Sequence, residues 1–491
     1  MKVLLVYPST PETFWSFRHV LRLVSKKAAF PPLGLLTVAA MLPDDWALRL
    51  VDMNVETLRD EVIQEYDWVF VSAMLIHKEA VGELARRCQA LGKPVMAGGP
   101  LFTANPDLFP EIPHRVLGEA EEILPQVVED LRLGTVQAVY QAAGRPALGR
   151  VPIPRWDLIN VHNYATMAVQ FSRGCPYDCE FCDIVVMNGR VPRTKAPGQL
   201  IAELEALRAH GWRDMVFIVD DNFIGDRPRT RVLLRALIEW RERTGSPLGF
   251  LTEASVNLAD DRELCELMVK AGFKKVFVGI ETPSVESLNE CHKLLNRGRD
   301  LVQAVQTLQR AGLEVMGGFI VGFDNDPQDI FRRQFEFIQR SGVVTAMVGL
   351  LTALPQTRLY QRLMREGRLE TESTGNNTQA SLNFRPKLGR EFLQAGYRDL
   401  MRRLYEPRTY YRRIRTFLKH HRPTTGPRLR LSQTDLQAFV KSLWLLGFRC
   451  RGRLAYWRML VSTLLLRPRQ FRQALELMIV GYHFRCIAES L

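Results

Sequence analysis

Three cysteines at CxxxCxxC spacing, directly after an apolar run, restrict the possible folds and functions of this chain more than any other feature. Cys175, Cys179 and Cys182 follow the strand-like residues 168–172. A loop with this spacing can turn three thiolates toward one point, as an iron–sulfur cluster requires. Three ligands leave one iron of a four-iron cluster open to a small molecule. A closed structural zinc site needs a fourth ligand, and no nearby His or Cys supplies it. The motif therefore predicts a 4Fe–4S cluster with an open iron.

The cysteine motif stands at the start of a long alternation of strand-like and helix-like segments. Stretches of helical periodicity, such as 197–210 and 229–244, separate six apolar runs. These runs are 168–172, 215–219, 249–253, 275–280, 315–321 and 345–351. Six such units without a Rossmann glycine pattern predict a partial (β/α)6 barrel related to the TIM architecture, with functional residues at the carboxyl ends of its strands.

A separate α/β domain is predicted ahead of the barrel. Apolar runs at 3–7, 47–52, 68–72 and 94–97 alternate with helical stretches such as 79–91. This alternation is typical of a doubly wound sheet, in which helices cover parallel strands on both faces. The proline-rich segment 145–154 indicates a linker. We therefore expect domains at 1–144, 155–384 and 385–491.

The segment 385–491 has a different character. Its predicted elements are the helices 390–404, 435–446, 454–466 and 471–484. It holds 23 Lys and Arg against six Asp and Glu, whereas the rest of the chain is slightly acidic. Arginines interleaved with Leu, Trp, Tyr and Phe suit a helical cap on the barrel, a peripheral membrane face or an RNA-binding surface. The sequence leaves these three open and favours nucleic acid least.

The composition of the chain indicates in which cellular compartment it works. The first apolar run is too short for a secretory signal, and no run reaches the roughly 18 apolar residues of a membrane-spanning helix. Eight cysteines without a signal peptide indicate a reducing compartment and no disulfide framework. We expect a cytoplasmic protein, with peripheral contact at the inner face of the membrane as an option for the tail.

Motifs at the predicted strand ends resemble those of the radical SAM superfamily, whose members cleave S-adenosylmethionine (SAM) at such a cluster. They read VDDNF at 219–223, TEAS at 252–255, GIET at 279–282 and GGFIVGF at 317–323, the last similar to a GxIxGxxE pattern. Asp324 stands where that pattern continues, so its last carboxylate stays open. Each acid could instead form a turn or a salt bridge, but several acids on one rim suit the cationic SAM. The SAM site that the resemblance implies consists of Phe181, Asp220, Asp221, Glu253, Ser255, Glu281, Ile320 and Gly322.

The amino-terminal domain resembles the cobalamin-binding domains of one large radical SAM subclass. The matching motifs are PPLGL at 31–35, AGGP at 97–100 and GEAE at 118–121. Glycines at strand ends let the backbone approach a flat ligand. The implied cobalamin site consists of Thr10, Pro32, Leu33, Gly34, Gly98, Gly99, Pro100 and Glu119. The DxHxxG motif, which supplies a lower axial histidine, is absent, and we expect the alternative His77 to lie at the surface. A degenerate domain that has lost its cobalamin is the competing interpretation.

Nearly the whole chain is similar to a subgroup of cobalamin-dependent radical SAM proteins that includes hopanoid methylases and archaeal lipid ring-forming enzymes. TFWSF at 13–17 and the motifs above carry the resemblance. It implies a methyltransferase that acts on an unactivated carbon of a hydrophobic, hopanoid- or isoprenoid-like lipid, through a 5′-deoxyadenosyl radical and methylcobalamin. An electron donor of flavodoxin or ferredoxin type is implied as well. The alternatives are a radical SAM cyclase or C–C bond-forming enzyme without methyl transfer, and a non-catalytic sensor that binds cobalamin or a cluster.

Overall fold

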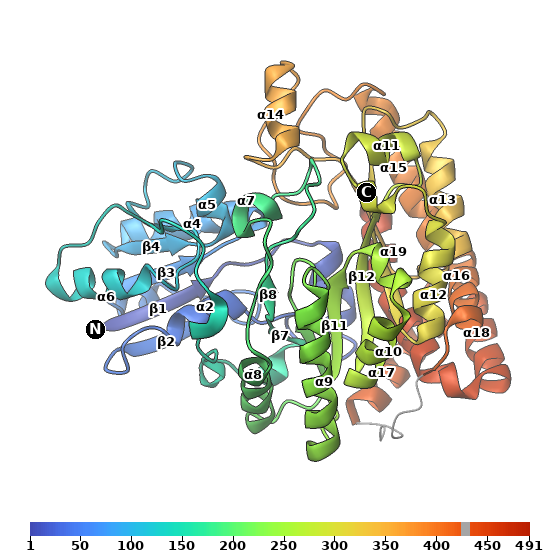
Figure 1. Cartoon of the computed structure of the whole chain (residues 1–491), viewed down its shortest axis with the longest axis horizontal. Helices are drawn as coiled ribbons and strands as arrows, with labels where there is room; N and C mark the ends of the chain where they lie inside the picture. Colours follow the sequence, from blue (N-terminus) through green and yellow to red (C-terminus); the bar gives the residue numbers. More distant parts are fainter. Residues whose placement is uncertain (424–432) are drawn as a thin grey trace.

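A computed structural model describes residues 1–423 and 433–491, which form two parallel six-stranded sheets and a helical carboxyl-terminal region (Figure 1). The first sheet has the order β2-β1-β3-β4-β5-β6. Its strands are β1 (Lys2–Tyr7), β2 (Ala47–Asp52), β3 (Trp68–Ser72), β4 (Val95–Gly98), β5 (His114–Leu117) and β6 (Val139–Gln141). The order reverses between β1 and β3, and ligands of open α/β sheets bind at such a reversal.

The helices of the first sheet connect its parallel strands. They are α2 (Leu33–Ala39), α3 (Asp60–Gln64), α4 (Lys78–Ala90), α5 (Pro100–Ala104) and α6 (Leu124–Leu133). The doubly wound prediction is confirmed, and the strands β1 to β4 match the predicted runs within two residues. The strands β5 and β6 have no counterpart among the predicted runs, because they are only four and three residues long and carry few buried side chains.

The second sheet is the predicted partial barrel, with the order β14-β13-β12-β11-β10-β7. Its strands are β7 (Met167–Val169), β10 (Met215–Ile218), β11 (Gly249–Ala254), β12 (Phe273–Glu281), β13 (Glu314–Val321) and β14 (Ala346–Leu350). The helices that lie outside it are α8 (Pro197–Ala209), α9 (Arg227–Thr244), α10 (Arg262–Ala271), α12 (Leu301–Ala311) and α13 (Ile330–Ser341). Because β7 and β14 are the two edges, the barrel stays open on one side. A short hairpin of β8 (Ser172–Arg173) and β9 (Arg193–Thr194) follows β7.

Strand β12 shows how side chains divide between the two faces of the barrel wall. Val276, Val278 and Ile280 are fully buried and face the helices. Because side chains alternate along a strand, Phe277 and Glu281 point to the interior. The interior therefore carries an aromatic ring at mid-height and a carboxylate at the rim.

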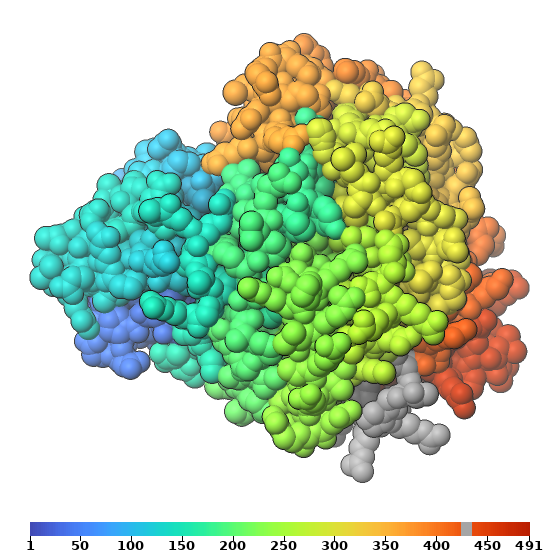
Figure 2. Space-filling view, in the orientation of Figure 1, coloured from blue at the N-terminus to red at the C-terminus, as the bar shows by residue number. Residues whose placement is uncertain are grey.

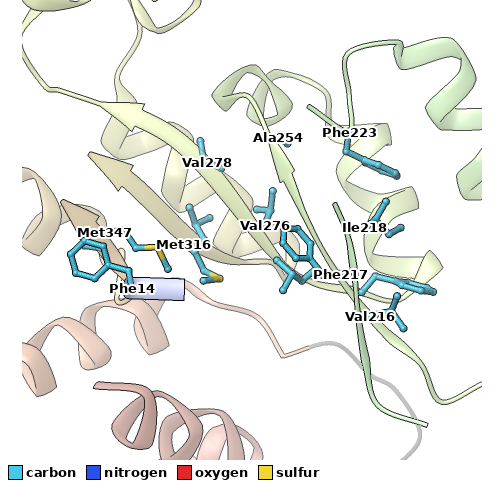
Figure 3. Packing of buried hydrophobic residues seen from close by; sticks show 14 of the residues in the cluster. Phe14, Val216, Phe217, Ile218, Phe223, Ala254, Val276, Val278, Met316 and Met347 are labelled. Atoms are coloured by element: carbon cyan, nitrogen blue, oxygen red, sulfur yellow. The ribbon is translucent and has the colours of Figure 1, made fainter. Parts of the chain in front are cut away.

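The amino-terminal segment and the last helix close the open side of the barrel. Phe14 of η1 (Phe14–Ser16) lies beside Met316 and Met347 in Figure 3 and stacks on Phe484 of α19 (Phe471–Ser490) with ring centroids 5.7 Å apart. His483 Nε2 lies 3.0 Å from the Thr13 carbonyl oxygen. Two segments at opposite ends of the sequence thus complete the core of the barrel.

The carboxyl-terminal region is helical, as predicted. α14 (Arg358–Arg365) lies over the upper rim of the barrel in Figure 1. The remaining helical elements are α15 (Arg390–Tyr405), α16 (Pro407–His420), α17 (Gln433–Trp444), η8 (Leu445–Arg449), α18 (Arg453–Leu466), η9 (Pro468–Gln470) and α19. Part of this region, coloured orange to red, protrudes at the lower right of Figure 2. Residues 424–432 of the basic segment lie outside the described part. Among the described helices, none is both long and apolar enough to cross a membrane.

Candidate active site

The cysteine loop connects β8 to β9 at the carboxyl end of the barrel. Gly174 has a φ of +102°, and a Cβ there would approach the carbonyl oxygens of Gly189 and Val191 to 3.0 Å, so only glycine fits. The Cys175 amide donates to the Gly189 carbonyl at 3.1 Å. This tight crossing fixes the direction in which the loop starts.

The three predicted cluster ligands lie near enough to one another for their charges to interact. Burial raises the pKa of Cys179, and the charge of Cys175 raises it further. Burial likewise raises the pKa of Cys182, with a further contribution from Cys179. Within the described residues no group of three or more His, Cys, Asp or Glu could hold a single metal ion. Three neighbouring thiols beside the buried cation Lys293 suit an anionic iron–sulfur cluster.

Helix α14 holds the cysteine loop from the outside. Arg362 Nε donates to Glu180 Oε1 at 2.7 Å, and the Leu359 amide donates to the Glu180 carbonyl at 2.9 Å. Arg358 pairs with Asp178. On the opposite flank, the Glu180 amide donates to the Cys291 carbonyl at 2.9 Å. The residues between the cysteines are thus clamped by two separate segments.

Two of the predicted SAM-contacting acids are occupied by the loop itself. Asp220 is buried and accepts from the Phe171 amide at 2.7 Å and from Ser172 Oγ at 2.6 Å. Burial raises the pKa of Asp220 to about 7. Asp221 Oδ2 accepts from the Gly174 amide at 2.8 Å and from Asn188 at 2.9 Å. Both carboxylate oxygens of Asp220 therefore accept hydrogen bonds from the chain around the loop, whereas only one oxygen of Asp221 does so within the described chain.

Glu253 is the predicted acid that remains open to a ligand. It lies partly exposed at the end of β11, and its side chain forms no hydrogen bond or ion pair within 1–423 and 433–491. Burial, together with the charges of Asp221 and Asp220, raises its pKa to about 8. An unpaired carboxylate of this kind suits a cationic ligand.

An amide bridge that the sequence analysis overlooked connects the strand ends to the cluster loop. Asn222 Nδ2 lies 3.9 Å from Cys175 Sγ, and Asn222 Oδ1 accepts from the Ser255 amide at 3.2 Å. Ser255 Oγ in turn donates to Asn257 at 2.7 Å, and Asn257 donates to Tyr177 at 2.8 Å. The predicted residue Ser255 thus belongs to a network that ends at a cluster cysteine.

Glu281, at the end of β12, forms an ion pair with Lys293. Lys293 Nζ donates to Glu281 Oε1 at 2.9 Å, and both side chains are nearly buried. Burial alone lowers the pKa of Lys293, but the negative charges of Glu281 and Cys179 raise it above the usual lysine value. Glu281 has a left-handed φ of 64°, and the missing side chain of Gly279 makes room for the pair.

The last predicted SAM residues border the same rim. Phe181 lies between two cluster cysteines and contacts the ring of Phe323 at 6.2 Å. Ile320 is partly exposed, and Gly322 has a φ of +110°. Beyond this turn, Asp326 Oδ2 accepts from the Gly322 amide at 2.7 Å.

Asp324 points away from this turn. It pairs with Arg368 at 2.6 Å and Arg362 at 3.0 Å. Although burial raises the pKa of Asp324, these guanidinium groups lower it to about 2. Asp324 is therefore part of the clamp formed by α14.

The carboxyl edge of the first sheet has the glycine backbone that the sequence predicted. Gly99 has a φ of +91°, and a Cβ there would lie 2.7 Å from Ser72 Oγ. Gly98 ends β4, and Pro100 begins α5. Pro32 and Leu33 begin α2, and a Cβ on Gly34 would meet nothing within 4 Å. Backbone at these glycines carries no side chain, and the space beside Gly34 is open. A flat ligand such as a corrin ring could bind against such a surface.

The expectation of a surface position for His77 is wrong, because this side chain is fully buried under Thr10. The Met74 amide donates to His77 Nδ1 at 3.2 Å, so Nε2 carries the proton and donates to Thr10 Oγ1 at 3.0 Å. Burial lowers the pKa of His77 to about 4. Both ring nitrogens are thus engaged within the domain.

Glu119, predicted to contact cobalamin, links the first sheet to the cluster loop. Its carboxylate pairs with Arg173 and Arg193, both at 2.6 Å. Although burial favours the neutral acid, hydrogen bonds from Arg193 and Arg173 lower the pKa of Glu119. Arg173 directly precedes Gly174, so the pair ties the two candidate cofactor regions together.

Aromatic rings occupy the barrel interior below the rim. Trp15 stacks on Phe217 at 5.9 Å with an interplanar angle of 8°, and it contacts Phe277 at 5.3 Å and Phe30 at 6.1 Å. Trp15, Phe30 and Phe277 are only partly buried. Further down β12, Lys275 pairs with Glu314 at 3.6 Å and closes the lower end. The interior is therefore apolar between an acidic rim and a charged floor.

Comparisons with known proteins agree with this architecture. The B12 binding domain matches residues 20–128, the radical SAM superfamily matches 169–338, and a domain of unknown function matches 357–491. An uncharacterized methyltransferase of Synechocystis is 41% identical and the hopanoid C-2 methylase of Rhodopseudomonas palustris 34% identical, over 99% and 98% of this chain. The alignments cover 91% and 92% of those relatives.

Two solved structures share the fold. The cobalamin-dependent SAM radical enzyme OxsB, with aqua-cobalamin and SAM bound, has a TM-score of 0.64 at 14% identity over 100% of this chain and 79% of its own. The methyltransferase TsrM of Kitasatospora setae, with cobalamin and a 4Fe–4S cluster, has a TM-score of 0.63 at 15% identity, covering 98% and 99%. On its two domains and its full-length relatives, the chain belongs to the cobalamin-dependent radical SAM methyltransferases, enzymes that use a 4Fe–4S cluster, SAM and cobalamin.

Proposed function

We propose that the protein methylates an unactivated carbon of a hydrophobic lipid of the hopanoid or isoprenoid class. The observation that carries this proposal is the stack of partly exposed rings around Trp15 inside the barrel. Flat aromatic surfaces below the rim suit a flat, apolar polycycle, because burying apolar area is favourable and needs no polar partner. The name of the relative from Rhodopseudomonas palustris supports the same substrate class.

The cofactor contacts are assigned as follows. Cys175, Cys179 and Cys182 hold the cluster. The Glu253 carboxylate, which has no protein partner among the described residues, binds a positively charged group of SAM. The other polar groups of the SAM site are Asp221, Ser255 and Glu281. Its apolar or backbone contacts are Phe181, Ile320 and Gly322. The cobalamin contacts are Thr10, Pro32, Leu33, Gly34, Gly98, Gly99 and Pro100. Asp220 and Glu119 are left out because their carboxylates are engaged elsewhere.

When bound, these cofactors supply the radical that removes a hydrogen atom and the methyl group that replaces it. The protein's own residues then have three tasks: to orient the substrate, to exclude water and to hold the cluster loop rigid. The aromatic interior serves the first two, and the clamps on Glu180 and Arg173 serve the third. An electron donor of flavodoxin or ferredoxin type completes the proposal.

The domain boundaries 1–144, 155–384 and 385–491 are part of the proposal. The first sheet ends with Gln141 and the barrel begins at Met167, which supports the first boundary. Residues 357–384 are better described as a bridge, since α14 precedes the third domain yet contacts the cluster loop.

Incubation of the anaerobically reconstituted protein with methyl-labelled SAM and a hopanoid lipid extract tests the proposal. We expect label in the lipid, with S-adenosylhomocysteine and 5′-deoxyadenosine formed together. If 5′-deoxyadenosine forms without S-adenosylhomocysteine, and the lipid changes in mass without gaining label, the cyclase alternative is favoured. Cys179→Ala should abolish SAM cleavage and leave the cobalamin absorbance intact.

Trp15→Ala tests the role of the aromatic interior. It should lower lipid methylation more than SAM cleavage, because the lipid loses its contact surface while the rim is unchanged. Trp68→Ala is the matched control, since Trp68 is also partly buried but packs on His114 in the first sheet. Equal methylation by both variants would contradict the proposed binding surface.

A further inference from the structure

The helical tail carries a stripe of exposed apolar side chains along α17 and η8. Leu436, Val440, Trp444 and Phe448 stand at four-residue spacing and are each between 57% and 62% exposed. Residues at this spacing lie on one face of a helix. Large apolar side chains that gather on one exposed face, unlike scattered ones, indicate an interaction surface.

A second stripe runs along α18. Leu454, Val461 and Leu465 are 80%, 48% and 73% exposed, and Arg458 lies between the first two. On the other side of the helix Tyr456 is buried. The stripe ends in the exposed residues Leu464 and Leu466.

An aromatic contact joins the two stripes. The ring of Phe448 contacts Trp444 at 6.2 Å in the first stripe and Trp457 of α18 at 5.9 Å. The indole nitrogen of Trp457 also donates to the Gly447 carbonyl at 3.0 Å. We call the joined surface, from Leu436 to Leu466, the tail face.

The helices of the tail face carry positive charge, although Glu406 and Glu489 of neighbouring helices border it beside Arg451 and Arg453. Residues 436–475 hold eight Lys and Arg and no Asp or Glu. Five of the arginines are exposed and form no ion pair within the described part of the chain; these are Arg449, Arg451, Arg453, Arg458 and Arg469. By contrast, arginines near the barrel rim, such as Arg362 and Arg173, are paired with acids.

A basic pocket adjoins the end of the second stripe. It has a volume of about 490 Å³ and includes Leu466 in its lining. Its charged lining groups are Lys419, Arg310, Arg422, Arg467 and Arg469, with no acid among its residues. Cationic side chains around a cavity of this kind suit a phosphate group.

We propose that the tail face docks on an anionic phospholipid bilayer, with its apolar stripes among the acyl chains and its arginines at the headgroups. Exposed leucines gain by burial in hydrocarbon, and unpaired arginines gain by meeting lipid phosphates. A symmetric contact with a second copy would bring the arginines of one tail face against those of the other. The phosphates of an RNA would neutralise the arginines, but an RNA would leave the exposed leucines without an apolar partner.

The tail face also lies next to the segment that forms the barrel interior. Lys441 Nζ on α17 donates to the Arg22 carbonyl at 3.3 Å and to Ser25 Oγ at 3.1 Å. Docking would therefore hold the amino-terminal segment that contains Trp15 near the membrane surface. The inference rests on the tail alone and holds for any substrate of the barrel.

Co-sedimentation of the full-length protein with vesicles tests the proposal. We compare phosphatidylcholine vesicles with vesicles that also contain phosphatidylglycerol. We expect binding to the anionic vesicles that weakens as salt is raised. Arg458→Ala should weaken this binding about fivefold, since one basic residue near an anionic surface contributes about 1 kcal/mol. Leu465→Glu should weaken it about tenfold through lost apolar burial.

Leu133→Glu is the matched control, because Leu133 on α6 is 65% exposed and its chain neighbours include two acids, Glu129 and Asp130, with one arginine, Arg132. It should bind like the wild type. Thermal unfolding and cobalamin absorbance check that each variant is folded. The proposal is overturned if the wild type does not bind anionic vesicles. It is equally overturned if the Leu465→Glu and Leu133→Glu variants bind them with the same affinity. It is also overturned if the main effect of Leu465→Glu is loss of a dimer or of RNA binding.

Discussion

Lys293 and Glu281 form a nearly buried ion pair, 2.9 Å between Nζ and Oε1, beside the three cysteines of the cluster loop. The two residues come from separate elements, since Glu281 ends β12 and Lys293 follows α11 (Val285–Glu290). Their pairing ties the barrel rim to the segment whose Cys291 carbonyl accepts from the Glu180 amide. The pair thus joins the barrel rim to the segment that holds the cysteine loop.

Lys293→Met should lower the free energy of unfolding by about 3 kcal/mol, because it leaves the Glu281 carboxylate buried without its cation. The double variant Lys293→Met with Glu281→Gln should recover part of this loss, since it removes the unpaired charge. Chemical denaturation of the cluster-free protein measures both. Equal stability of the single and double variants would contradict a paired charge.

Arg362→Met should loosen the cluster loop. Arg362 contacts Glu180, Asp324 and Glu290, so its loss removes several charged hydrogen bonds at once. We expect about 1.5 kcal/mol less stabilisation of the loop and, correspondingly, about tenfold faster loss of iron after reconstitution. Iron content and absorbance during dialysis against a chelator measure it.

Arg332→Met is the control for the Arg362 variant. Arg332 also pairs with two acids, Asp329 and Glu336, but on the exposed surface of α13. It should retain iron like the wild type, because exposed pairs contribute little. Equal iron loss from both variants would mean that α14 does not stabilise the loop.

Much of the architecture could be predicted because strands buried on both faces leave a continuous apolar signal. All six barrel strands overlap predicted runs, and the motifs VDDNF, TEAS and GIET do lie at strand ends. The TEAS motif also put Glu253 at a strand end, and its contact with SAM stays a prediction. These features depend on residues that are close together in sequence.

Contacts between distant segments could not be predicted. Trp15 enters the barrel interior from the amino-terminal segment, and Arg362 reaches the cluster loop from 182 residues away. Lys293 lies in no recognisable motif. His77 looked like a surface residue because it follows a strand end, yet burial of its ring depends on Thr10 and Met74. The sequence pattern holds no local trace of such pairings.

Gly99→Ala and Gly118→Ala make a matched pair at the candidate cobalamin site. Both glycines have a left-handed φ, +91° and +89°, so alanine strains both backbones. Only at Gly99 would the new Cβ also meet Ser72 Oγ at 2.7 Å and the Ala73 carbonyl at 3.0 Å. We expect a loss of about 1 kcal/mol in unfolding free energy at Gly118 and about 2 kcal/mol or more at Gly99.

Cobalamin content separates the two roles of these glycines. Gly99→Ala should lower the cobalamin bound per chain, read from its absorbance, by more than its stability loss explains, whereas Gly118→Ala should follow stability alone. If both variants bind cobalamin equally, the close approach of backbone at Gly99 does not serve the cofactor.

Glu253→Gln should stabilise the protein in a pH-dependent way. The folded-state pKa of about 8 lies above the ordinary glutamate value near 4.3, so the native state holds this proton more tightly than the unfolded chain. Stability from this group is therefore greatest below about pH 4 and falls as pH rises toward 8. Glutamine mimics the protonated acid and removes that loss.

Thermal unfolding across this range measures the Glu253 effect. The Tm of Glu253→Gln should match the wild type near pH 4.5 and exceed it increasingly up to about pH 8. Glu83→Gln on the exposed face of α4 should give no such trend. Added SAM should narrow the gap at pH 8 in the cluster-loaded protein, because a bound cation favours the ionised carboxylate of the wild type. A gap that is constant with pH would mean that Glu253 titrates normally and is not the open carboxylate of the rim.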